Sequence, residues 1–134
     1  MPTLPDFRLE THFAKWEFSA RYHMTASDAE SMSLPELLAY ASSEDREAFE
    51  TMWLGYTETF GAPDLREAIA ATYAAQKADN ILCFAGASEG IFAANTVLLE
   101  NDSHAIVVTP NYQSHESLPL AICEATGVPL DPND

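Results

Sequence analysis

The second half of the chain alternates short apolar runs with stretches of helical period. The apolar runs predict three buried strands, at residues 81–86 (ILCFAG), 104–110 (HAIVVTP) and 128–130 (VPL). Small and apolar residues recur at helical spacing over residues 88–99 and predict a helix. Residues 112–127 predict a second helix, which Pro119 interrupts and Gly127 closes.

Apolar strands that alternate with helices favour parallel pairing through right-handed crossovers. We therefore predict an α/β fold with a short parallel sheet of βαβαβ order. The strand at 81–86 is expected to pair directly with the strand at 104–110, because an unpaired strand edge demands a partner. The alternative is an oligomer that exchanges segments between its copies.

The first half of the chain carries helix signals. Residues 33–36 (SLPE) have the Ser-x-x-Glu form of a capping box, and residues 27–30 (SDAE) have the same form. A helix is predicted after the first of these, another over residues 44–53, and a third after Pro63. Five residues are expected to form the inward face of this third helix: Leu65, Ala68, Ile69, Thr72 and Tyr73.

The composition excludes several classes of partner. Six basic residues face 21 acidic ones, and the net charge is −15. Because phosphate backbones and anionic lipids need clustered Lys and Arg, we expect no nucleic acid and no membrane partner. The N-terminus lacks a basic start and an apolar stretch, so a cytoplasmic location is expected. Cys83 and Cys123 stand in apolar contexts and are expected to be buried small side chains.

The turn at residues 85–90 (AGASEG) joins a predicted strand to a predicted helix. Gly86 allows the backbone to bend or to approach a ligand, and Ala87 and Ser88 offer N–H groups at the positive end of the helix. The strand at 104–110 leads into Tyr112, an aromatic that can stack on a planar ligand at the same sheet edge. Such turns and aromatics also occur with no role beyond connection and packing.

Three motifs occur in one order: GYTETFGAPDLREAIA from residue 55, FAGASEGI from residue 84 and VVTPNY from residue 107. Together they resemble the class I/II aminotransferases of fold type I, which use pyridoxal phosphate, over roughly residues 55–130. The N-terminal segment resembles the branch near capreomycidine synthase. The resemblance implies a partial three-layer aminotransferase large domain. It divides the chain into a helical N-terminal arm at 1–54 and a truncated α/β cofactor-binding region at 55–134, within one structural domain overall.

The resemblance also assigns residues to the cofactor. Gly86, Ala87 and Ser88 match the turn that cradles its phosphate, and Tyr112 matches the aromatic that stacks on its ring. Tyr56 matches the tyrosine that reaches the phosphate of the neighbouring subunit, which implies a homo-oligomer, either a dimer or one with exchanged segments. Four residues match the structural G-x-P-x-L-R motif: Gly61, Pro63, Leu65 and Arg66.

The residues that would complete the chemistry are missing from these 134 positions. The lysines are Lys15 and Lys77, and neither stands in the context of the family's Schiff-base lysine. The family's aspartate for the pyridine nitrogen and its arginine for the substrate carboxylate are also absent. We therefore expect an N-terminal fragment with no catalytic residue and no metal, whose amino-acid substrate belongs only to a full-length parent.

Three alternatives remain open at this point. The chain could be an interaction or dimerisation module that uses the aromatic side chains of its N-terminal segment, which could equally cover a small core: Phe7, Phe13, Trp16, Phe18 and Tyr22. His104, His115 and Cys123 could hold a metal, although their spacing matches no common ligand pattern. The letters G-x-S-x-G at 86–90 could mark a hydrolase serine, with His104 or His115 as its base.

Overall fold

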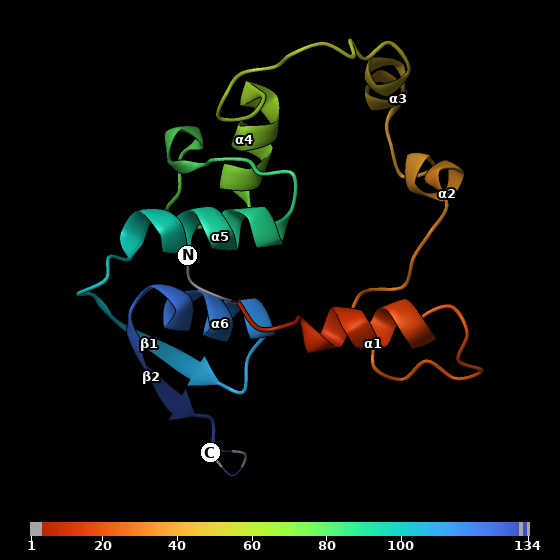
Figure 1. Cartoon of the computed structure of the whole chain (residues 1–134). Helices are drawn as coiled ribbons and strands as arrows, with labels where there is room; N and C mark the ends of the chain where they lie inside the picture. Colours follow the sequence, from red (N-terminus) through yellow and green to blue (C-terminus); the bar gives the residue numbers. More distant parts are fainter. Residues whose placement is uncertain (1–3, 132, 134) are drawn as a thin grey trace. The chain divides into compact units, whose positions relative to one another are not determined.

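The computed structural model describes residues 4–131 and residue 133. The chain packs as two units, one formed by residues 1–22 with 83–134 and the other by residues 23–82 (Figure 1). The division into segments 1–54 and 55–134 stays a prediction, because it follows sequence motifs rather than packing. None of the described helices combines the length and apolar character that a membrane span requires.

The unit of residues 23–82 is helical. It contains four elements: α2 (Leu34–Leu38), α3 (Ser43–Glu50), α4 (Pro63–Ala71) and the 3-10 turn η1 (Ala78–Asn80). The predicted capping box at Ser33 is present, since Ser33 accepts from the Glu36 amide and Glu36 accepts from the Ser33 amide. Hydrogen bonds from Ser33 hold the pKa of Glu36 below its ordinary value. The second Ser-x-x-Glu sequence, at 27–30, begins no helix, because a cap needs an apolar periodic segment behind it.

Helix α4 begins at Pro63, whose missing N–H does no harm in the first turn. Its less exposed side is formed by Arg66, Ile69 and Ala70, whereas Leu65 and Tyr73 are 50% and 59% exposed. The predicted inward face is therefore rotated by about one residue around the helix, and of its five residues Ile69 alone lies on the less exposed side. The reason is Arg66, whose guanidinium binds the carbonyls of Ala78 and Ile81 and so turns this side of α4 toward η1.

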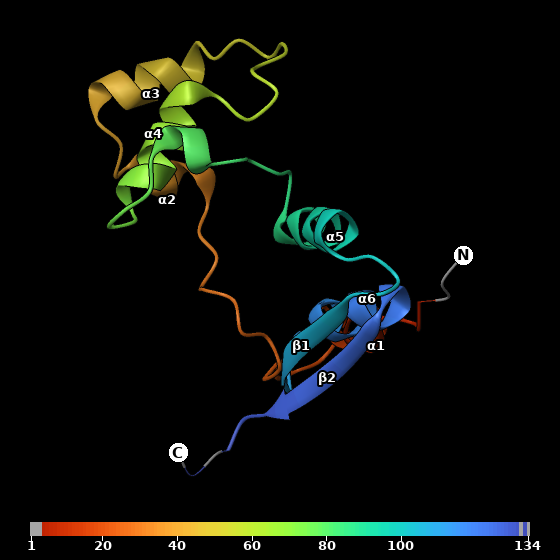
Figure 2. The same cartoon turned by 90° about the vertical axis from the view of Figure 1, so that its left-hand side faces the viewer.

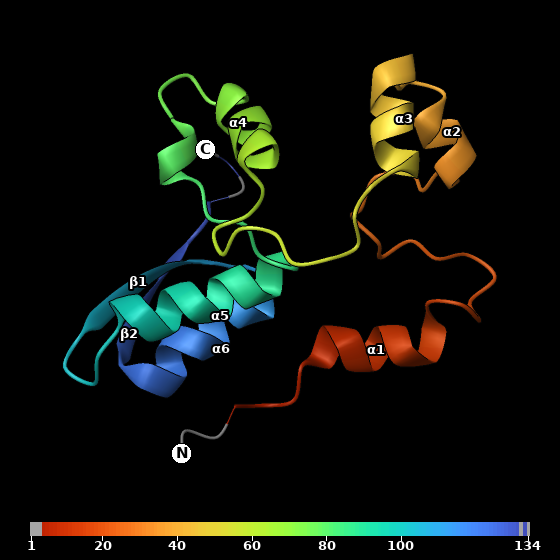
Figure 3. The same ribbon diagram turned by 90° about the horizontal axis from the view of Figure 1, so that it is seen from above.

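The unit of residues 1–22 and 83–134 contains helices packed with one small parallel sheet. Its elements are α1 (Arg8–Trp16), α5 (Ala87–Leu98), β1 (His104–Thr109), α6 (Gln113–Ile122) and β2 (Glu124–Pro129). Strands β1 and β2 pair in parallel, from His104 opposite Glu124 to Thr109 opposite Pro129. Helix α6 connects them and lies along the two-stranded sheet (Figure 2), and α5 packs alongside α6 (Figure 3).

The sheet differs from the prediction in two places. Residues 81–84 form no strand among the described residues, so the sheet has two strands instead of three. Helix α6 ends at Ile122 rather than near Gly127, and Gly127 lies in β2 opposite Val107. A strand exists only where a neighbouring edge accepts its hydrogen bonds, and in the described residues β1 pairs with β2 alone.

Burial is sparse in both units. Among the described residues only Ala70 and Pro119 are buried. Alternate residues of β1 are exposed, including Ile106 at 71% and Val108 at 45%, so the strand predicted to be buried has one open face. Cys83 and Cys123 are free thiols and half-buried rather than buried.

Candidate functional site

The turn before α5 has the features of an anion-binding turn. Gly86 caps the helix in an extended conformation, with φ −174° and ψ 163°, and a Cβ added there would meet no other atom within 4 Å. Ala87 and Ser88 form the first turn of this 12-residue helix and are exposed. Their N–H groups therefore stand at the positive end of the helix dipole with open space in front of Gly86.

An acid of the chain itself reaches into this turn. Glu89 Oε2 accepts a hydrogen bond of 2.8 Å from the Ala85 amide. The carboxylate thus satisfies one N–H group of the turn and brings a negative charge close to it. An incoming anion has to share the turn with this charge.

Tyr112 occupies the connection between β1 and α6. The connection contains a cis peptide bond between Thr109 and Pro110. Asn111 Oδ1 accepts from the Tyr112 amide at 2.8 Å, and Glu116 Oε1 accepts from the Asn111 amide at 2.9 Å. Tyr112 is the N-cap residue of α6, so its ring lies next to the start of a second helix.

The ring of Tyr112 is held by aromatic and polar neighbours. Phe7 meets it edge-on at 5.1 Å between centroids, and the His115 ring lies 6.3 Å away. The Tyr112 hydroxyl donates to Glu10 Oε1 at 3.3 Å. Partial burial, followed by the charge of Glu10, raises the pKa of Tyr112 above its ordinary value. The ring nevertheless stays 38% exposed, so part of it is free to contact a ligand.

The starts of α5 and α6 face a common cavity of about 270 Å³. Ser88 lines it from α5, Gln113 and Ser114 line it from α6, and Phe7 lines it from the N-terminal segment. The Ser114 hydroxyl oxygen is buried without a hydrogen-bond partner in the part of the chain that the structure describes. The structure thus brings Ser88 together with the neighbours of Tyr112, although Gly86, Ala87 and Tyr112 do not line this cavity.

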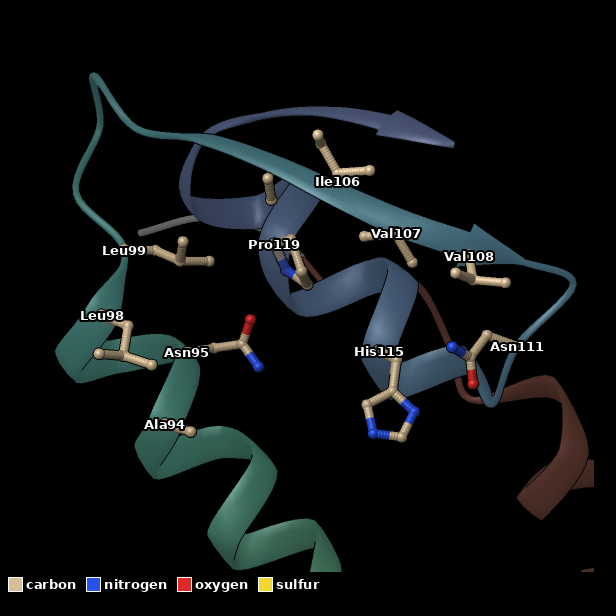
Figure 4. A pocket seen from close by; sticks show the side chains of 11 residues that line it. Ala94, Asn95, Leu98, Leu99, Ile106, Val107, Val108, Asn111, His115 and Pro119 are labelled. Atoms are coloured by element: carbon tan, nitrogen blue, oxygen red, sulfur yellow. The ribbon is translucent and has the colours of Figure 1, made fainter. Parts of the chain in front are cut away.

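A second cavity, of about 390 Å³, lies between α5, β1 and α6. Asn95 on α5 and His115 on α6 point into it, and Asn111 stands at one end (Figure 4). Apolar residues including Leu98, Val107 and Pro119 form the rest of its wall. The Nδ1 atom of His115 is buried and has no partner among the described residues. Asn95 was missed as a site residue, because only the fold shows that its side of α5 meets α6.

Tyr56 belongs to the other packing unit. Its side chain is fully exposed, and the residue lines a cavity of about 940 Å³ with Phe49, Met52 and Leu65 of the same unit. Its role toward the cofactor phosphate of a neighbouring subunit stays a prediction.

The remaining alternatives find little geometric support. The Nε2 atom of His104 lies 2.8 Å from Thr126 Oγ1, and the described residues contain no group of three metal-ligand side chains. Ser88 and His115 line different cavities. Of the lysines, Lys15 lies on α1 with its Nζ 4.8 Å from the Trp16 ring, and Lys77 is the N-cap residue of η1.

The chain matches known proteins over most of its length. The family model for "Aminotransferase class I and II" matches residues 27–132. An aspartate aminotransferase from Pyrococcus horikoshii is 30% identical in an alignment 103 residues long, which covers 66% of this chain and 26% of that protein. This chain thus spans about a quarter of the length of that curated relative.

Solved structures of aminotransferase-like enzymes share the fold of this chain. A PLP-dependent aminotransferase from Streptococcus suis 89-1591 superposes with a TM-score of 0.85 at 25% identity, over 98% of this chain and 36% of that one. The PLP-dependent cyclase OrfR superposes with a TM-score of 0.81 at 23% identity, over 96% of this chain and 34% of that one. These matches confirm the predicted partial aminotransferase fold. The chain belongs to the class I and II aminotransferase family.

Proposed function

We propose that this chain supplies the N-terminal part of a pyridoxal phosphate site, in the branch near capreomycidine synthase, and does not transaminate by itself. The observation that carries the proposal is the open turn at Gly86, from which the N–H groups of Ala87 and Ser88 begin a 12-residue helix. Family membership supplies the identity of the anion. The matched solved structures include PLP-dependent enzymes, and they are about three times longer than this chain.

The residues present fit part of the coenzyme. The turn amides and the Ser88 hydroxyl would hold the phosphate, and the exposed part of the Tyr112 ring would cover a planar pyridine ring. Tyr56, whose side chain is fully exposed, would reach the phosphate of a neighbouring copy. When bound, pyridoxal phosphate supplies an electron-withdrawing ring that stabilises negative charge on a substrate carbon.

The chain's own groups do not complete the chemistry. A lysine is needed to tether the coenzyme and to move the substrate proton. Lys15 Nζ lies on the Trp16 ring, and Lys77 stands on the helical unit at the start of η1. We therefore propose that the tethering lysine and the substrate-binding arginine come from polypeptide outside these 134 residues.

The test measures binding of pyridoxal 5′-phosphate to the purified chain by equilibrium dialysis, with pyridoxal as the ligand that lacks a phosphate. We expect weak binding of the phosphate form only. Ser88→Asp should weaken it about tenfold or more, because a carboxylate beside the turn repels the phosphate. An acid in the first turn favours the helix itself, so unfolding would not explain the loss. Ser27→Asp, an equal change of charge at an exposed loop position, should leave the affinity unchanged.

Two results would contradict this proposal. One is equal affinity for pyridoxal and for its phosphate ester, which would remove the role of the turn. The other is a coenzyme adduct on Lys15 or Lys77 that borohydride reduction makes permanent, which would show that the chain carries its own tethering lysine.

The exposed aromatics favour a second candidate, an interaction module that dimerises or binds a partner. Phe18 is 95% exposed and Tyr22 is 74% exposed, whereas Phe7 and Phe13 are half-buried. Light scattering over a concentration series measures this directly. Self-association that Phe18→Ser weakens would support the module, because Phe18 has no part in the proposed coenzyme site. A strict monomer would exclude the dimerising module and also the proposed role of Tyr56 toward a neighbouring copy.

A further inference from the structure

The side chain of Gln113 joins the start of α6 to the N-terminal segment of the chain. Its Oε1 atom accepts from the Arg8 amide at 3.1 Å, and its Nε2 atom donates to the Asp6 carbonyl at 2.8 Å. These partners are 105 and 107 residues away along the sequence. The planar amide therefore binds the backbone on both sides of Phe7, in the way that a peptide group of a neighbouring strand would.

The segment that Gln113 holds is the one that contacts Tyr112. Phe7 lies between the two bound backbone groups and meets the Tyr112 ring edge-on at 5.1 Å. Glu10, in the first turn of α1, accepts from the Tyr112 hydroxyl at 3.3 Å. Phe7 also lines the cavity that Ser88 and Gln113 share. Gln113 itself makes none of these contacts with the Tyr112 ring or its hydroxyl.

We propose that Gln113 is a positioning residue, which clamps residues 6–10 against Tyr112 and thereby fixes the orientation of its ring. The purpose of the clamp rests on the proposed function, because a stacking ring must be held in one plane to cover a coenzyme. The clamp itself is a property of the chain alone. Helix α1 begins without a side-chain cap from its own N-cap residue Phe7, so the two bonds of Gln113 add to the Phe7 and Glu10 contacts in holding this segment.

Three titratable side chains lie around Tyr112. Glu10 binds the hydroxyl, His115 lies beside the ring on α6, and Glu116 binds the amide of the preceding residue. Of these three groups, only Glu10 belongs to the clamped segment, residues 6–10. The titration of Tyr112 therefore reports on the clamp, because release of the segment removes the acidic acceptor and uncovers the ring.

The experiment compares wild type with Gln113→Leu in the full chain. The Tyr112 titration is assigned with Tyr112→Phe and followed by NMR, and exchange of the Arg8 amide is followed in the same samples. In the Leu variant we expect the pKa of Tyr112 to fall toward its ordinary value of about 10, and the Arg8 amide to exchange about tenfold faster. Gln76→Leu, which removes a single bond to Asn80 in the other unit, should change neither reading.

A second variant protects the test from misfolding. Gln113→Glu keeps an acceptor for the Arg8 amide but cannot donate to the Asp6 carbonyl, so its Arg8 amide should exchange at a rate between those of wild type and Gln113→Leu. If both variants keep the wild-type circular dichroism, the wild-type Tyr112 titration and the wild-type Arg8 exchange, the clamp is refuted. A different result is a wild-type chain that binds no pyridoxal phosphate while Gln113→Leu still lowers the Tyr112 pKa and speeds Arg8 exchange. That result would support the clamp and reject only the proposed function.

Discussion

Arg66→Ala is expected to destabilise the unit of residues 23–82 by roughly 2–4 kcal/mol. The guanidinium donates from Nε to the Ile81 carbonyl at 3.0 Å and from a terminal nitrogen to the Ala78 carbonyl at 2.7 Å. Hydrogen bonds from a charged donor contribute about 1.5–3 kcal/mol each, and truncation leaves both carbonyls without their partner. The pairing with Asp79, at 3.7 Å, adds little because that carboxylate is 99% exposed.

Hydrogen–deuterium exchange of peptides that cover residues 63–82 measures the effect, beside thermal unfolding by circular dichroism. Arg66→Lys should recover only a minor part, since an ammonium group cannot reproduce the planar fork. Arg46→Ala is the matched control. Arg46 makes one exposed bond, to the Leu38 carbonyl, and its loss should cost less than about 1 kcal/mol. Equal effects of the two alanine variants would show that Arg66 does not organise this unit.

Gly61→Ala is expected to destabilise the same unit by about 1–2 kcal/mol. Gly61 has a φ of 109°, which is the only positive φ among the described residues. A side chain at such an angle collides with the backbone, so the alanine must strain or shift the turn. The turn matters because Gly61 donates to the Glu58 carbonyl at 2.9 Å and leads directly into Pro63 at the start of α4.

The contrasting substitution is Gly90→Ala, inside α5. Alanine stabilises a helix interior by up to about 1 kcal/mol relative to glycine, and the new Cβ would lie 3.3 Å from the half-exposed ring of Phe84. We expect no net loss there. Peptide-resolved exchange separates the two units, and unchanged exchange over residues 56–71 in Gly61→Ala would contradict the prediction.

The residues of the candidate site were named from local patterns and from the family resemblance, and their roles stay predictions. The residues of the turn, Gly86 to Ser88, could be named because a glycine followed by small residues before a helical period is a local signal. Tyr112 could be named because it follows a strand and a proline. Their neighbours could not: the contact of Gln113 with Asp6 joins residues 107 positions apart, and no local pattern specifies it.

Local signals in the sequence predict the starts of three helices, α2, α4 and α5. Ser33, Pro63 and Gly86 act through hydrogen bonds and backbone angles within a few residues, so the sequence alone contains the interaction. It also determined that residues 104–109 are a strand followed by a helix and a second parallel strand.

The pairing of the apolar runs and the inward sides of the helices depend on residues that are distant along the chain. Residues 81–84 have the composition of a strand but form none, because strand formation depends on a partner edge that the run itself does not contain. Arg66 turned α4 through contacts with residues 12 and 15 positions away. Such choices depend on three-dimensional neighbours, whereas helix caps depend on the next three residues.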